Sequence, residues 1–236
     1  MWLSTSRAGR WLSGWGGLLF PPQCLVCGRE VEALVPVCGE CAAGIRGWEA
    51  VCAVCGVGIE TGLDLCPDCA VEAWSFSWAR SIGPYEGVLR ALVLLVKYEG
   101  ERAVAKFLAR RMAKLLVAEA AVVTWVPPDP QRLRARGFHG AELLGREVGR
   151  ALGLPARPLL RKIRASPPQV GRPRQERVRA MHGLFAATRD GTGESVLLVD
   201  DVMTSGATAS EGARALQEAG FGEVGVLTCA HAVGGE

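Results

Sequence analysis

The chain has 236 residues, 49% of them hydrophobic and 22% charged, which is typical of globular proteins and excludes a disordered one. Its longest apolar run, residues 91–96, is far shorter than the roughly 20 residues that a membrane-spanning helix needs. The tryptophan-bearing N-terminal segment, residues 1–23, is interrupted by Arg7 and Arg10 and lacks a small-residue cleavage site. We therefore expect a soluble, cytoplasmic protein.

The net charge of +3 conceals a strong asymmetry. Residues 131–179, the basic block, contain 13 Arg and Lys but three acids, whereas the rest of the chain is net acidic. Such a block indicates an anionic ligand, either phosphate groups or nucleic acid. A general preference for arginine, which outnumbers lysine 23 to 4, explains the choice of base but not the clustering.

Eight of the nine cysteines form four Cys-x-x-Cys pairs, and the first two pairs recur 28 residues later. We call residues 24–41 the first ribbon and residues 52–69 the second ribbon. In each ribbon the pairs predict two sharp turns at the ends of a short hairpin. The cysteines are Cys24, Cys27, Cys38 and Cys41 in the first ribbon, and Cys52, Cys55, Cys66 and Cys69 in the second.

Two such pairs supply four thiolates, which suits tetrahedral zinc, so we expect about two structural Zn²⁺ ions. Disulfides or redox pairs are the alternatives, which a cytoplasmic location and the fourfold repetition disfavour. One ion within each ribbon matches the repeat better than a crossed arrangement. Because the ribbons carry few basic residues, a structural or protein-docking role is favoured over phosphate binding.

Beyond the ribbon module, residues 24–71, periodicity predicts alternating strands and helices in residues 72–236. Strands are expected at residues 75–84, 121–126, 157–160, 195–199 and 223–229, and helices at residues 88–96, 103–117, 138–152 and 207–219. This order predicts an α/β domain with a mostly parallel sheet that helices cover on both faces. Residues 161–182, rich in Arg, Pro and Gln, are expected to form a long mobile loop.

The most specific motif is the segment 196–208, VLLVDDVMTSGAT. A buried strand delivers Asp200 and Asp201 to the carboxyl edge of the sheet, where open α/β sheets bind ligands. The turn that follows opens a helix, whose N–H groups and dipole favour an anion. Two carboxylates beside such a site require a neutral or cationic partner, and ribose hydroxyls with Mg²⁺ satisfy that requirement.

This segment resembles the phosphoribosyl-pyrophosphate (PRPP) motif of type I phosphoribosyltransferases. The resemblance implies that Asp200 and Asp201 contact the ribose hydroxyls. It also implies that the turn binds the 5′-phosphate through Thr204, Ser205, Gly206, Ala207 and Thr208. Magnesium would then accompany PRPP.

More of the chain resembles the ComF competence-protein family, from about residue 17 to residue 232. The motifs are the double ribbon, Tyr85-x-Gly87-x-x-Arg90, Lys97-Tyr98-x-Gly100, Val126-Pro127-Pro128, and Arg132-x-x-x-Arg136-Gly137-Phe138. His139-Gly140 departs from the Asn-Gln pair common in the family, and Ala180 stands where an Asn is frequent.

The resemblance implies a pyrophosphate loop at residues 126–137 and a flexible loop at residues 161–182. The anion-binding candidates are Arg132, Arg136, Lys162, Arg164 and Arg177. It also implies handling of single-stranded DNA in natural transformation beside a ComFA-type helicase or ATPase. Two alternatives stay open: a catalytically active phosphoribosyltransferase that releases pyrophosphate from PRPP, and an adaptor whose pocket only senses PRPP.

Overall fold

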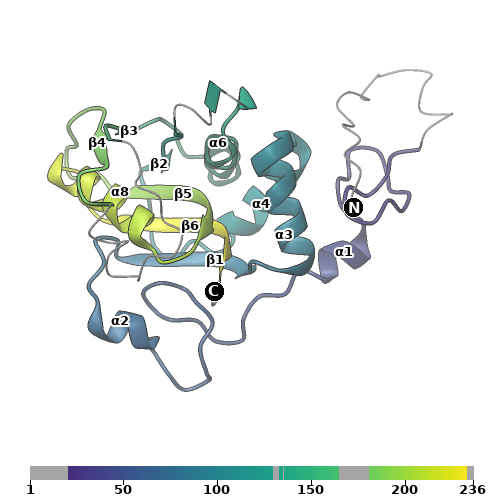
Figure 1. The fold of residues 1–236 in the computed structure, drawn as a ribbon, viewed down its shortest axis with the longest axis horizontal. Coiled ribbons are helices and arrows are strands. Elements are labelled where there is room, and N and C mark those ends of the chain that lie inside the picture. Colours follow the sequence, from purple (N-terminus) through teal and green to yellow (C-terminus); the bar gives the residue numbers. More distant parts are fainter. Residues whose placement is uncertain (1–20, 130–132, 135, 165–180, 233–236) are drawn as a thin grey trace.

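A four-stranded parallel sheet forms the centre of the computed structural model, which describes residues 21–129, 133, 134, 136–164 and 181–232 (Figure 1). Its strand order is β1 (Trp78–Pro84), β6 (Val224–His231), β5 (Val196–Met203) and β2 (Val122–Trp125). Every neighbouring pair is parallel. The expected mostly parallel sheet is thus confirmed.

Helices cover both faces of this sheet. On one face lie α3 (Gly87–Leu94), the π-helix η2 (Leu95–Glu99), α4 (Arg102–Ala113) and α6 (Gly140–Leu152), and on the other lies α8 (Ala207–Glu218). Where one helix over residues 88–96 was expected, the chain changes to π-helical geometry after Leu94. None of the helices in the described ranges has the length and apolar character needed to cross a membrane.

Two hydrophobic cores result from the alternation of side chains along the buried strands. Leu197 and Val199 of β5 pack on the side of α3, α4 and α6, whereas Val196 and Leu198 pack on the side of α8. A strand that is buried on both faces must be apolar at successive positions, which explains the uninterrupted run of four apolar residues before Asp200.

A second, antiparallel sheet pairs β3 (Leu160–Lys162) with β4 (Phe185–Ala187). This corrects the prediction that residues 161–182 form one long loop, because residues 161 and 162 belong to β3. The strand expected at residues 157–160 begins only at Leu160, while Ala156 forms a single parallel bridge to Val123. Residues 165–180, which include Arg177, lie outside the described residues.

The two ribbons share a backbone pattern, but the first contacts the helices α3 and α4 whereas the second contacts β1 of the sheet. In each ribbon the first Cys-x-x-Cys turn is closed by one β-bridge, Gln23 to Glu30 and Val51 to Gly58. The second turn opens a short helix, α1 (Gly39–Ala43) or α2 (Pro67–Val71), instead of ending a hairpin as expected. In Figure 1 the first ribbon projects beyond α3, whereas the second lies beneath the sheet.

Candidate functional site

Each ribbon brings its four cysteine sulfurs together, within 4.8 Å of one another. The groups are the sequential sets that the repeat predicted, one set in each ribbon. All nine cysteines belong to the described part of the chain, and none forms a disulfide. The S···S distances of 3.7 Å between Cys27 and Cys38 and 3.6 Å between Cys55 and Cys66 are close to the edge of about 3.8 Å that a ZnS₄ tetrahedron requires.

The chemistry of these donor sets also fits zinc, which binds thiolates rather than thiols. Burial raises the pKa of Cys24, but hydrogen bonds from the backbone N–H groups of Cys38 and Cys27 outweigh it, and the pKa falls to about 6. The same balance lowers the pKa of Cys52 to about 7. Burial raises the pKa of Cys41, Cys55 and Cys69, so zinc must displace their protons when it binds. By the number, type and spacing of their donors, the two four-cysteine clusters fit two structural zinc sites.

The acid pair lies within β5, because this strand continues four residues beyond the expected end at Val199. The backbone N–H of Asp201 donates to Asp200 Oδ1 over 2.8 Å. Lys97 Nζ, from the π-helix η2, lies 3.0 Å from Asp201 Oδ2. A lysine from a separate element thus neutralises one of the two carboxylates.

The second carboxylate resists ionisation. Burial and the neighbouring charge of Asp201 raise the pKa of Asp200 to about 8, although Lys97 and the backbone N–H of Asp201 act in the opposite direction. The pKa of Lys97 is raised because Asp201 outweighs the effect of burial. At neutral pH Asp200 therefore tends to keep its proton, and a ligand that prefers an ionised carboxylate there will displace it.

The segment after β5 forms a tight turn that opens α8. Gly206 is the N-cap of this helix with φ at +80°, a left-handed conformation that favours glycine. Glycine has no side chain that could cap a helix. Gly206 therefore leaves the N–H groups in the first turn of α8 without a side-chain cap. Thr204 is exposed, Thr208 is half-buried, and Ser205 and Ala207 are buried. The predicted phosphate-binding residues thus lie together directly after the acid pair.

The anion candidates do not all lie together. Arg136 lies near the acid pair: its guanidinium donates to the carbonyl oxygen of Lys97 and stacks 4.5 Å from the Tyr98 ring centre. Lys162 instead forms an ion pair with Asp129 at 2.7 Å, and Arg164 donates to the carbonyl oxygen of His182. Arg132 and Arg177 lie outside the described residues.

Two residues near the acid pair were not predicted as site residues. The available signal for Lys97 was its place in the Lys-Tyr-x-Gly motif. Gly100 of this motif ends the π-helix with a positive φ. His139 caps α6 and lines a hollow of about 240 Å³ between α4 and α6. Its Nδ1 atom is buried with no hydrogen-bond partner within the described ranges. Burial lowers the pKa of His139 despite the nearby Asp201, so the imidazole is neutral.

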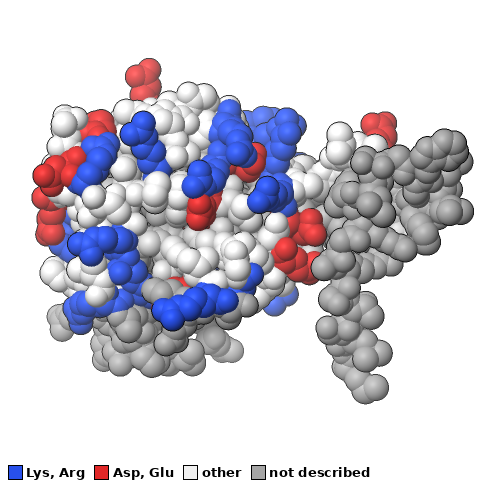
Figure 2. All heavy atoms as spheres, turned by 90° about the horizontal axis from the view of Figure 1, so that it is seen from above, with Lys and Arg blue, Asp and Glu red and all other residues white. Residues whose placement is uncertain are grey.

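The basic block lies partly on the described surface. Figure 2 shows Lys and Arg side chains spread over the face of the domain seen from above, with acids interspersed. Within the basic block, Arg146 is paired with Glu142 and Arg150 with Glu147. Five of the 13 bases of the block lie outside the described residues.

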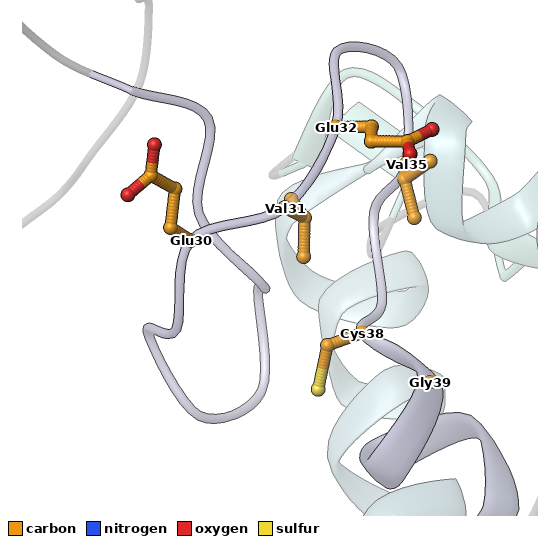
Figure 3. A pocket seen from close by; sticks show the side chains of 6 residues that line it. All are labelled: Glu30, Val31, Glu32, Val35, Cys38 and Gly39. Atoms are coloured by element: carbon orange, nitrogen blue, oxygen red, sulfur yellow. The ribbon is translucent and has the colours of Figure 1, made fainter.

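A separate hollow of about 660 Å³ lies beside the first ribbon, away from the acid pair (Figure 3). The side chains around it come from the hairpin of this ribbon and from the start of α1, among them Glu32, Val35 and Cys38. Its lining combines acids with apolar groups and offers no basic side chain among the described residues. It therefore does not contribute to the phosphate-binding candidates.

Comparison with known proteins supports this architecture. The family model "Double zinc ribbon domain" matches residues 16–73. The chain is 26% identical over 225 residues to Competence protein F of Haemophilus influenzae, which covers 89% of this chain and 85% of that protein.

Among solved structures, the chain matches part of the glutamine PRPP amidotransferase from B. subtilis complexed with ADP and GMP, 27% identical over 52% of this chain and 25% of that one, with a TM-score of 0.37. UMP synthase from Leishmania donovani is 18% identical over 59% of this chain and 24% of that one, also with a TM-score of 0.37. The matched part thus spans about a quarter of each of these longer chains. The double zinc ribbon and the similarity to Competence protein F over most of the chain confirm the resemblance to the ComF competence-protein family.

Proposed function

We propose that this protein binds PRPP with Mg²⁺ at the acid pair and the turn after β5, and that it acts in DNA uptake during natural transformation. In this proposal Asp200 and Asp201 hold the ribose hydroxyls, and residues 204–208 hold the 5′-phosphate. The protein would bind at the carboxyl edge of the sheet, where open α/β sheets place their ligands.

One observation carries the binding proposal: a paired acid site is followed at once by the glycine turn that opens α8. A plain phosphate ion would be repelled by the two carboxylates next to it. A phosphoribosyl group avoids this repulsion, because its neutral hydroxyls face the acids while its phosphate faces the helix N-terminus. The ion pair between Lys97 and Asp201 reduces the remaining negative charge.

Magnesium fits the same site by charge. Mg²⁺ prefers oxygen ligands and usually binds through one or two carboxylates together with substrate phosphates. The raised pKa of Asp200 implies that binding of the cation releases a proton at neutral pH. We therefore expect PRPP to bind more tightly with Mg²⁺, and more tightly as the pH rises toward 8.

The role in DNA uptake is supported by the similarity to Competence protein F over most of the chain. The basic block, with 13 Arg and Lys against three acids, supplies the positive charge that contact with single-stranded DNA needs. In this proposal a ComFA-type helicase or ATPase is the protein partner.

Calorimetric titration with PRPP, with and without Mg²⁺, tests the binding proposal. Asp201→Asn removes the charge but keeps the size, so affinity should fall by about one to two orders of magnitude. Gly206→Val should weaken binding at least as much, because φ is +80° there and a side chain would fill space near the phosphate. The matched control is Asp190→Asn, the same chemical change at an exposed site. Equal affinities in all four proteins would refute the proposed site.

A gene deletion tests the biological role. Loss of transformation with normal growth on minimal medium supports the DNA-uptake role, whereas a nucleotide requirement would support a metabolic phosphoribosyltransferase. Affinity for single-stranded DNA should also fall with salt by roughly 0.7 log units per log unit for each phosphate contacted. Release of pyrophosphate from PRPP with a panel of bases and amines would identify an acceptor.

A further inference from the structure

The indole of Trp74 lies between the second ribbon and the turn that opens α8. Its Nε1–H donates to the sulfur of Cys69 over 3.3 Å. The opposite edge of the ring faces Gly206, where an added Cβ would lie 3.4 Å from the indole carbons. The ring also stacks on Phe76, at 5.6 Å between centroids and an angle of 9°. One side chain therefore donates to a cysteine of the four-sulfur cluster and lies beside the glycine of the turn.

The residue after Trp74 fastens the same segment to α8. The N–H of Ser75 donates to Ser210 Oγ over 3.1 Å, and Gln217 Nε2 donates to the carbonyl oxygen of Ser75 over 2.9 Å. Ser210 in turn donates its backbone N–H to the carbonyl oxygen of Gly206. These contacts hold the first turn of α8 against the segment that leaves the second ribbon.

The second ribbon is itself fixed on the sheet. The N–H of Ala79 in β1 donates to the carbonyl oxygen of Val54 over 2.6 Å, and Arg80 donates to the carbonyl oxygen of Ala53 over 3.0 Å. The first ribbon instead contacts α4 on the other face, where Arg111 donates to the carbonyl oxygen of Ala42. Of the two clusters, the second is thus the one connected to the turn through a single side chain.

We propose that Trp74 is a positioning residue, through which the second four-cysteine site keeps the turn at residues 204–208 in its ligand-binding shape. When zinc occupies that site, Cys69 is a thiolate and therefore a stronger acceptor for the indole N–H. The fixed ring then restricts Gly206, a residue whose lack of a side chain leaves its backbone otherwise free. Zinc binding at the second site, but not at the first, therefore orders the turn. The consequence for ligand affinity rests on the proposed PRPP site.

Amide hydrogen–deuterium exchange of residues 203–212 in the full-length, zinc-loaded protein tests this without any ligand. Trp74→Ala should speed exchange in that peptide by about tenfold, since local opening costs less free energy. Trp74→Phe keeps a ring against Gly206 and removes only the N–H donor, so it should speed exchange by a smaller but measurable factor. The repeat supplies a matched cysteine pair: Cys66→Ser should have the effect of Trp74→Ala, and Cys38→Ser should have none.

The proposal would be overturned if the exchange rate of residues 203–212 in Trp74→Ala equalled that of the wild type. It would also be overturned if Cys66→Ser and Cys38→Ser changed this rate equally. An exchange rate in Trp74→Phe equal to that of the wild type would also overturn the proposal. The hydrogen bond from the indole to Cys69 would then have no effect on the order of the turn. If Cys66→Ser fails to fold, the two Trp74 variants decide alone. Calorimetry with PRPP and Mg²⁺ is a separate arm: a wild-type protein that does not bind refutes the proposed function, while the exchange data still decide the coupling.

Discussion

The two ribbons show how one sequence repeat can serve two structural purposes. Gly28 and Gly56 are equivalent positions of the repeat, and both have a positive φ, +75° and +70°. A Cβ at Gly28 would meet no atom within 4 Å, whereas a Cβ at Gly56 would collide with the carbonyl oxygen of Ala79 in β1. The local turn is therefore the same, but only the second turn is pressed against the sheet.

Burial of the cysteines follows the same division. Cys27 of the first ribbon is exposed, whereas its counterpart Cys55 is buried in the hydrophobic core beside α8. The positions that match in burial are Cys24 and Cys38 of the first ribbon and Cys52 and Cys66 of the second. The second ribbon thus depends on the sheet for burial, and part of that core depends on the ribbon in return. The first ribbon, which projects past α3 in Figure 1, is the part better placed to meet another molecule.

The largest expected effect comes from the cysteine pair that occupies equivalent positions. Cys66→Ser should lower the free energy of unfolding of the whole domain by about 4 kcal/mol or more, since a metal site and adjoining core are lost together. Cys38→Ser should release about one equivalent of zinc but shift the main unfolding transition by about 1 kcal/mol or less. Denaturant unfolding with zinc analysis measures both; similar shifts in the two variants would contradict the division.

The next effect concerns the two glycines. Gly28→Ala should cost about 1 kcal/mol, the penalty of a side chain in a left-handed conformation. Gly56→Ala should cost about 3 kcal/mol, because the collision with the Ala79 carbonyl adds to that penalty. Thermal unfolding of the pair gives the difference directly, and equal melting temperatures would show that the second turn is not held against β1.

A smaller effect is expected at the arginines that fasten the ribbons. Arg80 donates to the carbonyl oxygens of Ala53 and Ala79, whereas Arg111 has one such bond, to Ala42 at 3.2 Å. Arg80→Ala should therefore cost about 2 kcal/mol and Arg111→Ala about 1 kcal/mol. Urea unfolding measures both losses of unfolding free energy. A larger loss in Arg111→Ala than in Arg80→Ala would contradict the stronger attachment of the second ribbon.

The smallest effect is a difference in pH dependence between the sheet and the ribbons. Asp200 has a pKa of about 8 in the folded chain but about 3.9 when unfolded, so its contribution to stability falls as the pH rises from about 4 to 8. Asp200→Asn should then be more stable than the wild type at pH 8, and this advantage should shrink as the pH falls toward 4. The ribbons should respond in the opposite direction, because protonated thiols release zinc as the pH falls.

A stability gap at pH 8 that is absent or reversed would mean that Asp200 ionises as an ordinary surface carboxylate. Zinc retention followed over the same pH series provides the control, because it depends on the thiols and not on the acid pair.

The sequence predicted those features that local chemistry determines. The 28-residue repeat predicted both four-cysteine groups, and the apolar runs predicted the parallel sheet and four of its helices. The sequence-based prediction failed where tertiary packing determines the ends of an element. β5 continues through Asp200 because β6 pairs with it as far as His231, and no local sequence pattern encodes this pairing. Pairing between β3 and β4, far apart in sequence, was missed for the same reason.

The residues around the acid pair show the same limit. Asp200, Asp201 and the turn are contiguous, so one motif predicted them together. Lys97 pairs with Asp201 from a helix about 100 residues away, and Trp74 lies beside Gly206 although it comes directly after the ribbon module in the sequence. A single sequence carries the residue types of such contacts but not their proximity.

The most direct test of the central claim is a titration of the wild-type protein with ribose 5-phosphate and with PRPP, each with Mg²⁺. Ribose 5-phosphate has the hydroxyls and the 5′-phosphate but no pyrophosphate, so it probes the acid pair and the turn alone. The account predicts that both compounds bind, that ribose 5-phosphate is the weaker, and that it competes with PRPP for one site. Failure of both to bind, or binding of PRPP that ribose 5-phosphate does not displace even at saturation, would contradict it.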